Sequence, residues 1–279
     1  MKRTHNLFLI LLLSFILGDI SLAEDDFRKR AHQKSHTGNT VEDVEAEVHF
    51  GKTIAARILG QFHVYDDEKL TRYVNLVGKS LAMNASRNDI TFSFAVLDAD
   101  FINAYSAPGG YVFITKGAIQ AMQDEAELAA VLAHEVAHIT EKHIVKEFKI
   151  KGKERSATAG LSQLLSSSQS STTAIFSQAV DNAVKLLMNT GFKEKDEYES
   201  DEVAVMLLAA TGYDPTALRR YLKRTRKLEN KANKASTHKP THPPTFERLS
   251  ALKKTVKKNK LHKLKLPKGK IRFSKYAIK

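Results

Sequence analysis

Two histidines and a glutamate stand close together in the stretch His134-Glu135-Val136-Ala137-His138. Histidines four residues apart project from the same face of a helix, so both imidazoles can reach one metal ion. Glu135 lies about a quarter turn further on, where its carboxylate can contact a water molecule instead of the ion. Two imidazoles and one carboxylate suit zinc, which keeps a fourth position open for water in catalytic sites. We therefore expect zinc to activate a water molecule here, while Glu135 accepts its proton during attack on a carbonyl.

The alternative is a helix whose histidines only satisfy buried hydrogen bonds. Two buried imidazoles beside a buried carboxylate are costly without an ion, so the spacing favours a metal site.

A third protein ligand must come from another part of the chain. The acidic run Glu197-Tyr198-Glu199-Ser200-Asp201 begins a later helical segment. Glu197 and Asp201 are four residues apart, so one can bind the ion while the other orients a ligand imidazole. The residues that follow are apolar on all sides, so periodicity does not decide between Glu197 and Glu199. The alternative is a solvated first turn favoured by the helix dipole.

Several further motifs occur in the order typical of a known family. They are Asn103-Ala104, Pro108-Gly109-Gly110, the stretch 127–138, Glu197 through Asp201, Gly212 through Pro215, and His242-Pro243 through Arg248. With these motifs, residues 41–256 resemble the family-48 zinc metallopeptidases, which are gluzincins of the HtpX and CAAX prenyl protease type. The resemblance is to their exported BepA-like branch, without its helical-repeat domain. It implies a zinc-dependent endopeptidase that acts in protein quality control of the cell envelope.

The resemblance also implies a fold and a set of ligands. The expected fold is α+β and predominantly helical, a zincin-like domain with a small antiparallel sheet packed against the HExxH helix. His134, His138 and Glu197 are the implied ligands of one zinc ion per chain. Glu135 is the implied base, and Asp201 stands behind a ligand.

A loop histidine and an arginine join the site through the same resemblance. His242 and Arg248 are implied to be catalytic, since an imidazole there can stabilise the oxyanion of the reaction or occupy the open zinc position as a latch. By composition alone, His242 is a loop residue beside prolines, and His238 competes for its role. We interpret His143 and His63 as ordinary residues.

The hairpin Asn103–Thr115 resembles the family's edge strand, which would bind substrate by β-addition. Asn103, Ala104, Gly109 and Gly110 are the residues implied to form this edge.

Periodicity predicts the elements that position these residues. We expect helices over 41–62, after Asp66 or Asp67, over 124–148, from Glu194 to Ala210, from Pro215 to about Asn230, and over 245–256. Residues 90–98 and 111–117 read as two strands that form the antiparallel sheet, with the turn at Pro108 between them. The end of the chain, from Ile271 to Ile278, reads as a short strand. The Ser-rich segment 153–180 is either a mobile loop or a lid.

Asp124 is the expected N-cap of the 124–148 helix, with Glu127 three residues later as in a capping box.

The chain has 279 residues, 11 His and no Cys. The absence of Cys excludes disulfides, iron–sulfur clusters, thiol nucleophiles and Cys-ligated zinc, and leaves an imidazole site open. Basic residues followed by the apolar run 7–18 and Ser21-Leu22-Ala23 are typical of a secretory signal peptide, 1–23. The alternative is an uncleaved N-terminal anchor. Residues 24–40 are polar and expected to be flexible.

Positive charge gathers near the end of the chain. From Arg219 to Lys279 there are 22 Lys and Arg residues against two Glu residues, and residues 257–279 form a basic tail. We expect an anionic partner, and export favours a membrane surface or envelope partner over nucleic acid. The alternative is a solvated tail.

Together these features predict an exported, periplasmic protein, soluble or peripherally membrane-associated, whose substrates are unfolded or misassembled polypeptides. The alternative function is a self-capped metalloprotein that acts mainly as a chaperone-like or anionic-surface-binding protein.

Overall fold

The computed structural model describes residues 40–152, 170–232 and 241–278. The expected signal peptide, residues 24–39, residues 153–169 of the suggested lid and His238 lie outside the described residues. Within the described ranges, no helix combines the length and the apolar character needed to cross a membrane.

Helices make up most of the described chain. They are α2 (Val41–Gln61), α3 (Glu68–Ala82), α4 (Lys116–Gln120), α5 (Glu125–Thr140), α6 (His143–Glu147), α8 (Ser170–Lys185), α9 (Glu194–Thr211), α10 (Ala217–Ala232), α11 (Phe246–Lys258) and α12 (Lys270–Tyr276). A π-helical turn, η1 (Leu186–Thr190), follows α8, and a 3₁₀ turn, η2 (Leu261–Lys263), follows α11.

Capping side chains explain where these helices begin and end. Thr40, Asp67 and Asp124 each accept a hydrogen bond from the backbone N–H three residues later, which satisfies an otherwise orphaned donor. Thr245 caps α11 in the same way. Gly212 ends α9 with a positive φ of 86°, a conformation that glycine adopts without strain. Most of the predicted helices therefore begin close to their expected first residues.

Within the described residues the sheet has three strands, β1 (Ser93–Leu97), β2 (Ala104–Ala107) and β3 (Tyr111–Thr115), in the order β1-β3-β2. β2 and β3 form an antiparallel hairpin, whereas β1 pairs with β3 in parallel. The expectation of an antiparallel sheet was wrong for this second pairing. The segment before Pro108 is itself a strand and takes the hairpin position, so only the far edge of β3 is left for β1.

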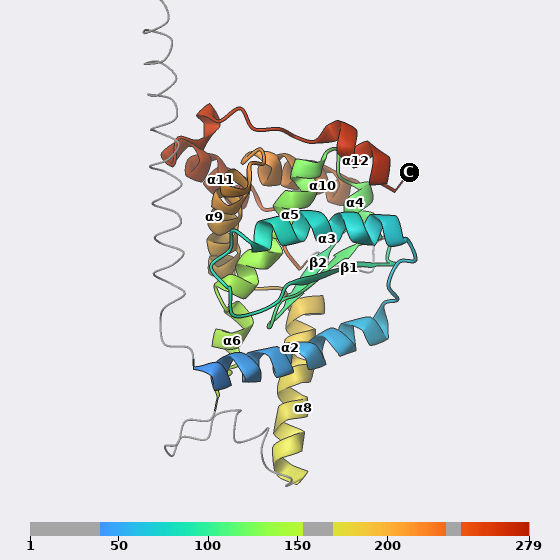
Figure 1. The fold of residues 1–279 in the computed structure, drawn as a ribbon, viewed down its shortest axis with the longest axis vertical. Coiled ribbons are helices and arrows are strands. Elements are labelled where there is room, and N and C mark those ends of the chain that lie inside the picture. Colours follow the sequence, from blue (N-terminus) through green and yellow to red (C-terminus); the bar gives the residue numbers. More distant parts are fainter. Residues whose placement is uncertain (1–39, 153–169, 233–240, 279) are drawn as a thin grey trace, which may run out of the picture. The chain divides into compact units, whose positions relative to one another are not determined.

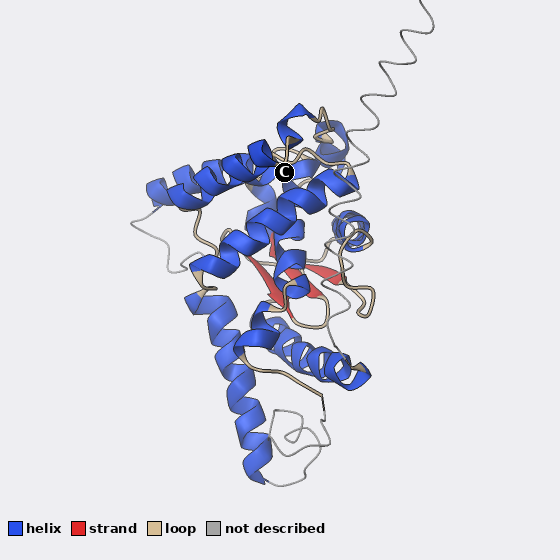
Figure 2. Ribbon diagram, turned by 90° about the vertical axis from the view of Figure 1, so that its left-hand side faces the viewer, coloured by secondary structure: helices blue, strands red, loops and turns tan. Residues whose placement is uncertain are grey.

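Helices enclose this sheet. β1 contacts α3, while β2 and β3 contact α2 and α5, and the strands lie between α3 and α2 in Figure 1. Figure 2 shows the strands surrounded by helices. Residue 51 is glycine because α2 crosses the hairpin turn closely: a Cβ there would lie 1.7 Å from the carbonyl oxygen of Pro108. Phe50 and Ile54 bury themselves in the core beside it.

The helix that carries the HExxH motif is the central element. Every residue of α5 from Glu125 to Ile139 is buried, and the helix packs against α3, α9 and α10. The predicted helix 124–148 is broken in two, because α5 ends at Thr140 and Lys142 adopts a left-handed φ of 58° before α6 begins. This break redirects the chain and sets the position of His143.

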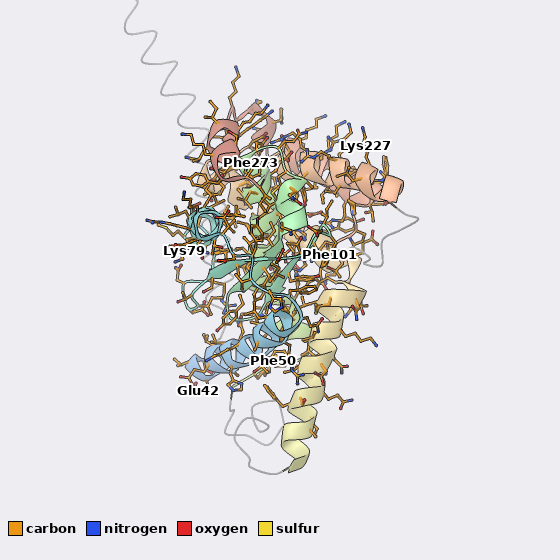
Figure 3. All side chains as sticks on the ribbon, turned by 90° about the vertical axis from the view of Figure 1, so that its right-hand side faces the viewer. Glu42, Phe50, Lys79, Phe101, Lys227 and Phe273 are labelled. Carbon is orange, nitrogen blue, oxygen red and sulfur yellow. The ribbon has the colours of Figure 1, made fainter. Side chains whose placement is uncertain are left out.

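The C-terminal segment packs onto the body as a helix, so the expected strand from Ile271 to Ile278 was wrong. Phe273 is buried and Tyr276 stacks on Tyr73 of α3 at 4.5 Å between ring centroids. Phe273 and Tyr276 are three residues apart in the sequence, which places them on one face of a helix. Figure 3 shows Phe273 directed into the fold from α12.

Candidate metal centre

Two imidazoles meet on one face of α5. His134 and His138 are each 3% exposed, and their Nε2 atoms lie 3.1 Å apart. The outer nitrogen of His134, Nδ1, lies 3.1 Å from Oδ1 of Asp201. When His134 donates its Nδ1 proton to this carboxylate, its Nε2 lone pair faces the centre of the cluster.

The neighbouring helix α9 brings a carboxylate to the two imidazoles. Glu197 places Oε1 3.4 Å from Nε2 of His138 and Oε2 3.5 Å from Nε2 of His134. Of the two glutamates that periodicity left open, the structure brings Glu197 to the imidazoles. Glu199 instead lies beside His143, at 3.4 Å.

His242 completes a group of four donors. Its Nδ1 atom lies 2.8 Å from Oε1 of Glu197 and 3.3 Å from Nε2 of His134. One ligand atom from each of four residues, His134, His138, Glu197 and His242, lies within 4.8 Å of the other three. The segment from Thr241 to the start of α11 therefore reaches the site although it follows α9 by some thirty residues.

The donor set fits a tetrahedral zinc ion. Zinc–ligand bonds of 2.0–2.1 Å place neighbouring donors about 3.3 Å apart in a tetrahedron. Five of the six pairs among these residues are given above, with Glu197 measured through one or the other of its oxygens, and they lie between 2.8 and 3.5 Å. Two imidazole lone pairs that face each other at this distance repel unless a proton or a cation stands between them.

Charge inside the cluster is strongly coupled. Burial raises the pKa of Glu197, but His242 and Arg248 outweigh it and hold that pKa well below its usual range. Burial lowers the pKa of His138 well below its ordinary value. Burial has the same effect on His134, yet hydrogen bonds to Asp201 and Glu197 prevail and raise its pKa to about 9. Glu197 thus stays ionised and His138 stays neutral, as metal binding requires, whereas His134 must release a proton before its Nε2 can bind an ion.

Arg248 ties the acidic residues of α9 to the loop. Its guanidinium donates to both carboxylate oxygens of Asp201, at 2.9 and 2.7 Å. Nη1 lies 2.6 Å from Oε2 of Glu197 and donates to the carbonyl of Pro243 at 3.2 Å. The arginine is 2% exposed. Its contacts hold Glu197, Asp201 and the loop that carries His242 together.

Glu135 points to the same region from the next position of α5. The hydroxyl of Ser106 in β2 donates to Oε2 of Glu135 at 2.8 Å, and Nε2 of His242 lies 3.7 Å from Oε1. Sequence reasoning missed Ser106. No local pattern marks this serine, because its hydroxyl reaches Glu135 only once β2 packs on α5.

A pocket opens beside these groups. Its lining includes Asn103, Ala104, His134, Glu135 and His242. Apolar side chains, among them Val131, Leu218 and Leu222, make up much of the rest.

Two of the four expected substrate-edge residues therefore reach the site, and two do not. Gly109 and Gly110 lie at the hairpin turn, against Val48 and Thr91.

The two histidines expected to be ordinary, His143 and His63, have different surroundings. His143, expected to be ordinary, is buried, and its Nδ1 lies 2.9 Å from Nδ1 of His138. His143 reaches this position because the helix is interrupted at Lys142, and the helical spacing in the sequence did not reveal that interruption. His63 is exposed and away from the metal ligands in sequence and environment.

The chain is similar in sequence to several known proteases. The chain is 23% identical over 252 residues to the beta-barrel assembly-enhancing protease of Escherichia coli (strain K12). The matched region covers 88% of this chain and 51% of that protein. It is 28% identical over 238 residues to the mitochondrial metalloendopeptidase OMA1 of Schizosaccharomyces pombe, covering 83% and 60% of the two chains. It is 24% identical over 181 residues to the metalloprotease LoiP of Escherichia coli (strain K12), covering 65% and 67%.

The chain spans about half the length of the first of these curated relatives. The model described as Peptidase family M48 matches residues 68–256, which include both α5 and α9. The match confirms the resemblance drawn from the motifs, and the mostly helical α+β fold agrees with a zincin-like domain. The chain therefore belongs to peptidase family M48.

Proposed function

We propose that the protein is a zinc-dependent endopeptidase that hydrolyses peptide bonds through a metal-activated water molecule. The observation that carries this proposal is the four-donor cluster with Glu135 beside it. Membership of family M48 supports a metalloprotease. The donor types and their separations support zinc as the ion.

The residues divide the work between holding the ion and moving a proton. His134, His138 and Glu197 hold the ion, and when bound it polarises a substrate carbonyl and lowers the pKa of a water molecule. Glu135 accepts the proton of the attacking water and passes it to the leaving nitrogen. Ser106 holds one carboxylate oxygen of Glu135, which leaves the other free for that proton.

A second candidate function has its own observation. Nδ1 of His242 occupies the position of a fourth donor, so the loop can act as a latch that caps the ion and leaves a chaperone-like protein with little turnover. His242→Ala then raises peptidase activity. If His242 instead stabilises the oxyanion of the reaction, the same variant loses activity.

Unfolded or misassembled polypeptides are the proposed substrates. The hairpin edge β2 and the pocket beside Glu135 can receive an extended chain and one of its side chains. One similar protein is named a beta-barrel assembly-enhancing protease, which supports a role in envelope protein quality control. The sequence features at the N-terminus support export to the periplasm.

The basic C-terminal region is proposed to contact an anionic membrane surface. From Arg248 to the end of the chain there are 13 Lys and Arg residues and no acidic residue. Most of these lysines are exposed on α11, α12 and the segment between them. A fixed, positively charged face attracts anionic lipid.

Casein digestion tests the main proposal. Wild-type protein is expected to digest unfolded casein, to lose this activity with a chelator, and to regain it with zinc. Glu135→Gln keeps the ligands and is expected to bind zinc while losing activity by several orders of magnitude. Glu202→Gln, an exposed substitution on α9, serves as the control. Equal digestion by wild type and Glu135→Gln would contradict the proposal.

A further inference from the structure

His138 engages both of its ring nitrogens. Nε2 faces the donor cluster, 3.1 Å from Nε2 of His134, and Nδ1 lies 2.9 Å from Nδ1 of His143. The side chains of His138 and His143 are 1% and 2% exposed. The contact between them is therefore closed to solvent.

The proton positions in this pair follow from the role of His138. A neutral imidazole has one donor nitrogen and one acceptor nitrogen. If His138 offers the lone pair of Nε2 to a cation, its proton must sit on Nδ1. His143 must then accept that proton's hydrogen bond with its own Nδ1, which places the proton of His143 on Nε2.

The surroundings of His143 favour that assignment. Oε2 of Glu199 lies 3.4 Å from Nε2 of His143, and Oδ1 of Asp196 lies 3.9 Å from it. Both are carboxylates from the first turns of α9, so the Nε2 position faces negative charge. A proton on Nε2 is stabilised there, whereas a lone pair is not.

Packing fixes the two rings relative to each other. Phe192 stacks on His138 with ring centroids 4.0 Å apart and also lies 5.9 Å from the ring of His143. The two imidazoles meet nearly edge-on, at 72°. The left-handed turn at Lys142 directs His143 back to this position.

We propose that His143 is a positioning residue of the zinc centre. It accepts the Nδ1 proton of His138, fixes the tautomer and orientation of that ligand, and with Asp196 and Glu199 raises its basicity. Partners of this kind change metal affinity by about 10- to 100-fold when removed. The inference rests on the proposed zinc site.

A second metal ion beside His143 would be incompatible with this role. His143, Asp196 and Glu199 are close enough to hold a cation. An ion there would take the lone pair of Nε2 and leave the proton of His143 on Nδ1. That proton would point at Nδ1 of His138 and force the proton of His138 onto Nε2, which removes its ligand lone pair.

Zinc affinity tests the proposal without using catalysis. His143→Leu removes the acceptor, and His143→Asn keeps a polar group near the position of Nδ1. Both variants are made in the Glu135→Gln background and titrated with zinc against a competing chelator. We expect a 10- to 100-fold weaker affinity for His143→Leu and recovery of most of it in His143→Asn. The exposed His63→Leu is the matched control and should match the parent.

Nitrogen NMR of the zinc-loaded Glu135→Gln protein tests the same claim without touching the pair. The spectrum should show His143 protonated on Nε2 and His138 protonated on Nδ1, with the His143 signals identified by their loss in His143→Asn. A proton on Nδ1 of His143, two tightly bound zinc ions per chain, or unchanged zinc affinity in folded His143→Leu would each overturn the inference. A parent protein that binds no zinc would overturn the proposed function itself.

Discussion

Arg248 shows how one buried side chain can organise several others. Its guanidinium contacts Asp201, Glu197 and the carbonyl of Pro243 at once. A planar fork with several donors can satisfy such a set, whereas a lysine ammonium acts as a single point charge. Arg248 thus links Glu197 on α9, the proposed acidic ligand, to the loop that carries His242.

Arg248→Lys is therefore expected to weaken zinc binding by about 10- to 100-fold, because Asp201 and Glu197 lose their shared partner. Competition with a chelator measures this. Arg226→Lys on α10, outside the cluster, should leave the affinity unchanged. An affinity within threefold of wild type for a folded Arg248→Lys protein would show that the arginine does not position the ligands.

At the scale of elements, the crossing of α2 over the hairpin depends on a missing side chain. Gly51→Ala adds a methyl carbon that would lie only 1.7 Å from the carbonyl oxygen of Pro108. We expect a loss of about 1–3 kcal/mol in the free energy of unfolding and lower activity, because the hairpin carries Ser106. Chemical denaturation measures the stability.

Gly60→Ala in the same helix is the control, since nothing lies within 4 Å of its added Cβ. That substitution should instead stabilise the protein by about 0.5–1 kcal/mol. Equal effects of the two substitutions would contradict the close approach at Gly51.

The packing of α12 depends on a buried carboxylate at the start of α5. Glu125 accepts hydrogen bonds from Tyr73 at 2.7 Å, from Tyr213 at 2.9 Å, and from Arg272. Burial raises the pKa of Glu125, but these hydrogen bonds, led by that from Arg272, outweigh it and leave the pKa below its ordinary value. The ionised carboxylate therefore stabilises the folded state.

The sign of the pH dependence follows. A lowered folded-state pKa gives stability that is fully present above the unfolded value of about 4.3 and is lost as the pH falls through the folded pKa. Glu125→Gln should be less stable than wild type at pH 7, and the difference should shrink below about pH 4. Thermal unfolding between pH 3 and 7 measures it, with the exposed Glu68→Gln as control. A constant difference across that range would contradict the prediction.

Local signals and long-range pairing differ in how far the sequence reveals them. Caps such as Asp67 and Asp124 act within one helical turn, so the helix starts were predictable. The partner of β1 was not, because alternation identifies a strand without naming its neighbour. The strand expected at Ile271 formed a helix, which buries Phe273 and stacks Tyr276 on Tyr73 of α3.

The residues of the candidate site likewise differ in whether a local pattern predicts them or only long-range packing brings them together. The spacing of His134 and His138 predicted the imidazole pair, whereas Glu197 and Glu199 could be separated only by the packing of α9 on α5. Ser106 and His143 depend on a hairpin and a chain reversal, and neither leaves a local pattern.

For the whole molecule, the distribution of charge predicts binding to a surface. Lys254, Lys257 and Lys258 are exposed on α11. Replacing all three with Gln should weaken binding to anionic phospholipid vesicles roughly a hundredfold, at about 1 kcal/mol per lysine. Co-sedimentation at low and high salt measures this, and binding should fall with salt.

The matched control replaces Lys52, Lys69 and Lys79, which are exposed on α2 and α3. The same loss from both triple variants would mean that overall charge, and not the C-terminal face, governs binding. Charge substitution is preferable to truncation, because Phe273 and Arg272 pack on the body and their removal would disturb the fold.

The most direct test of the central claim is the zinc content of the purified protein after gel filtration, measured by elemental analysis in wild type, Glu197→Ala and Glu202→Ala. One zinc ion per chain in wild type and Glu202→Ala, with most of it lost in Glu197→Ala, is the result that a centre shared by α5 and α9 predicts. Absence of zinc from wild type, or full zinc content in Glu197→Ala, would contradict it.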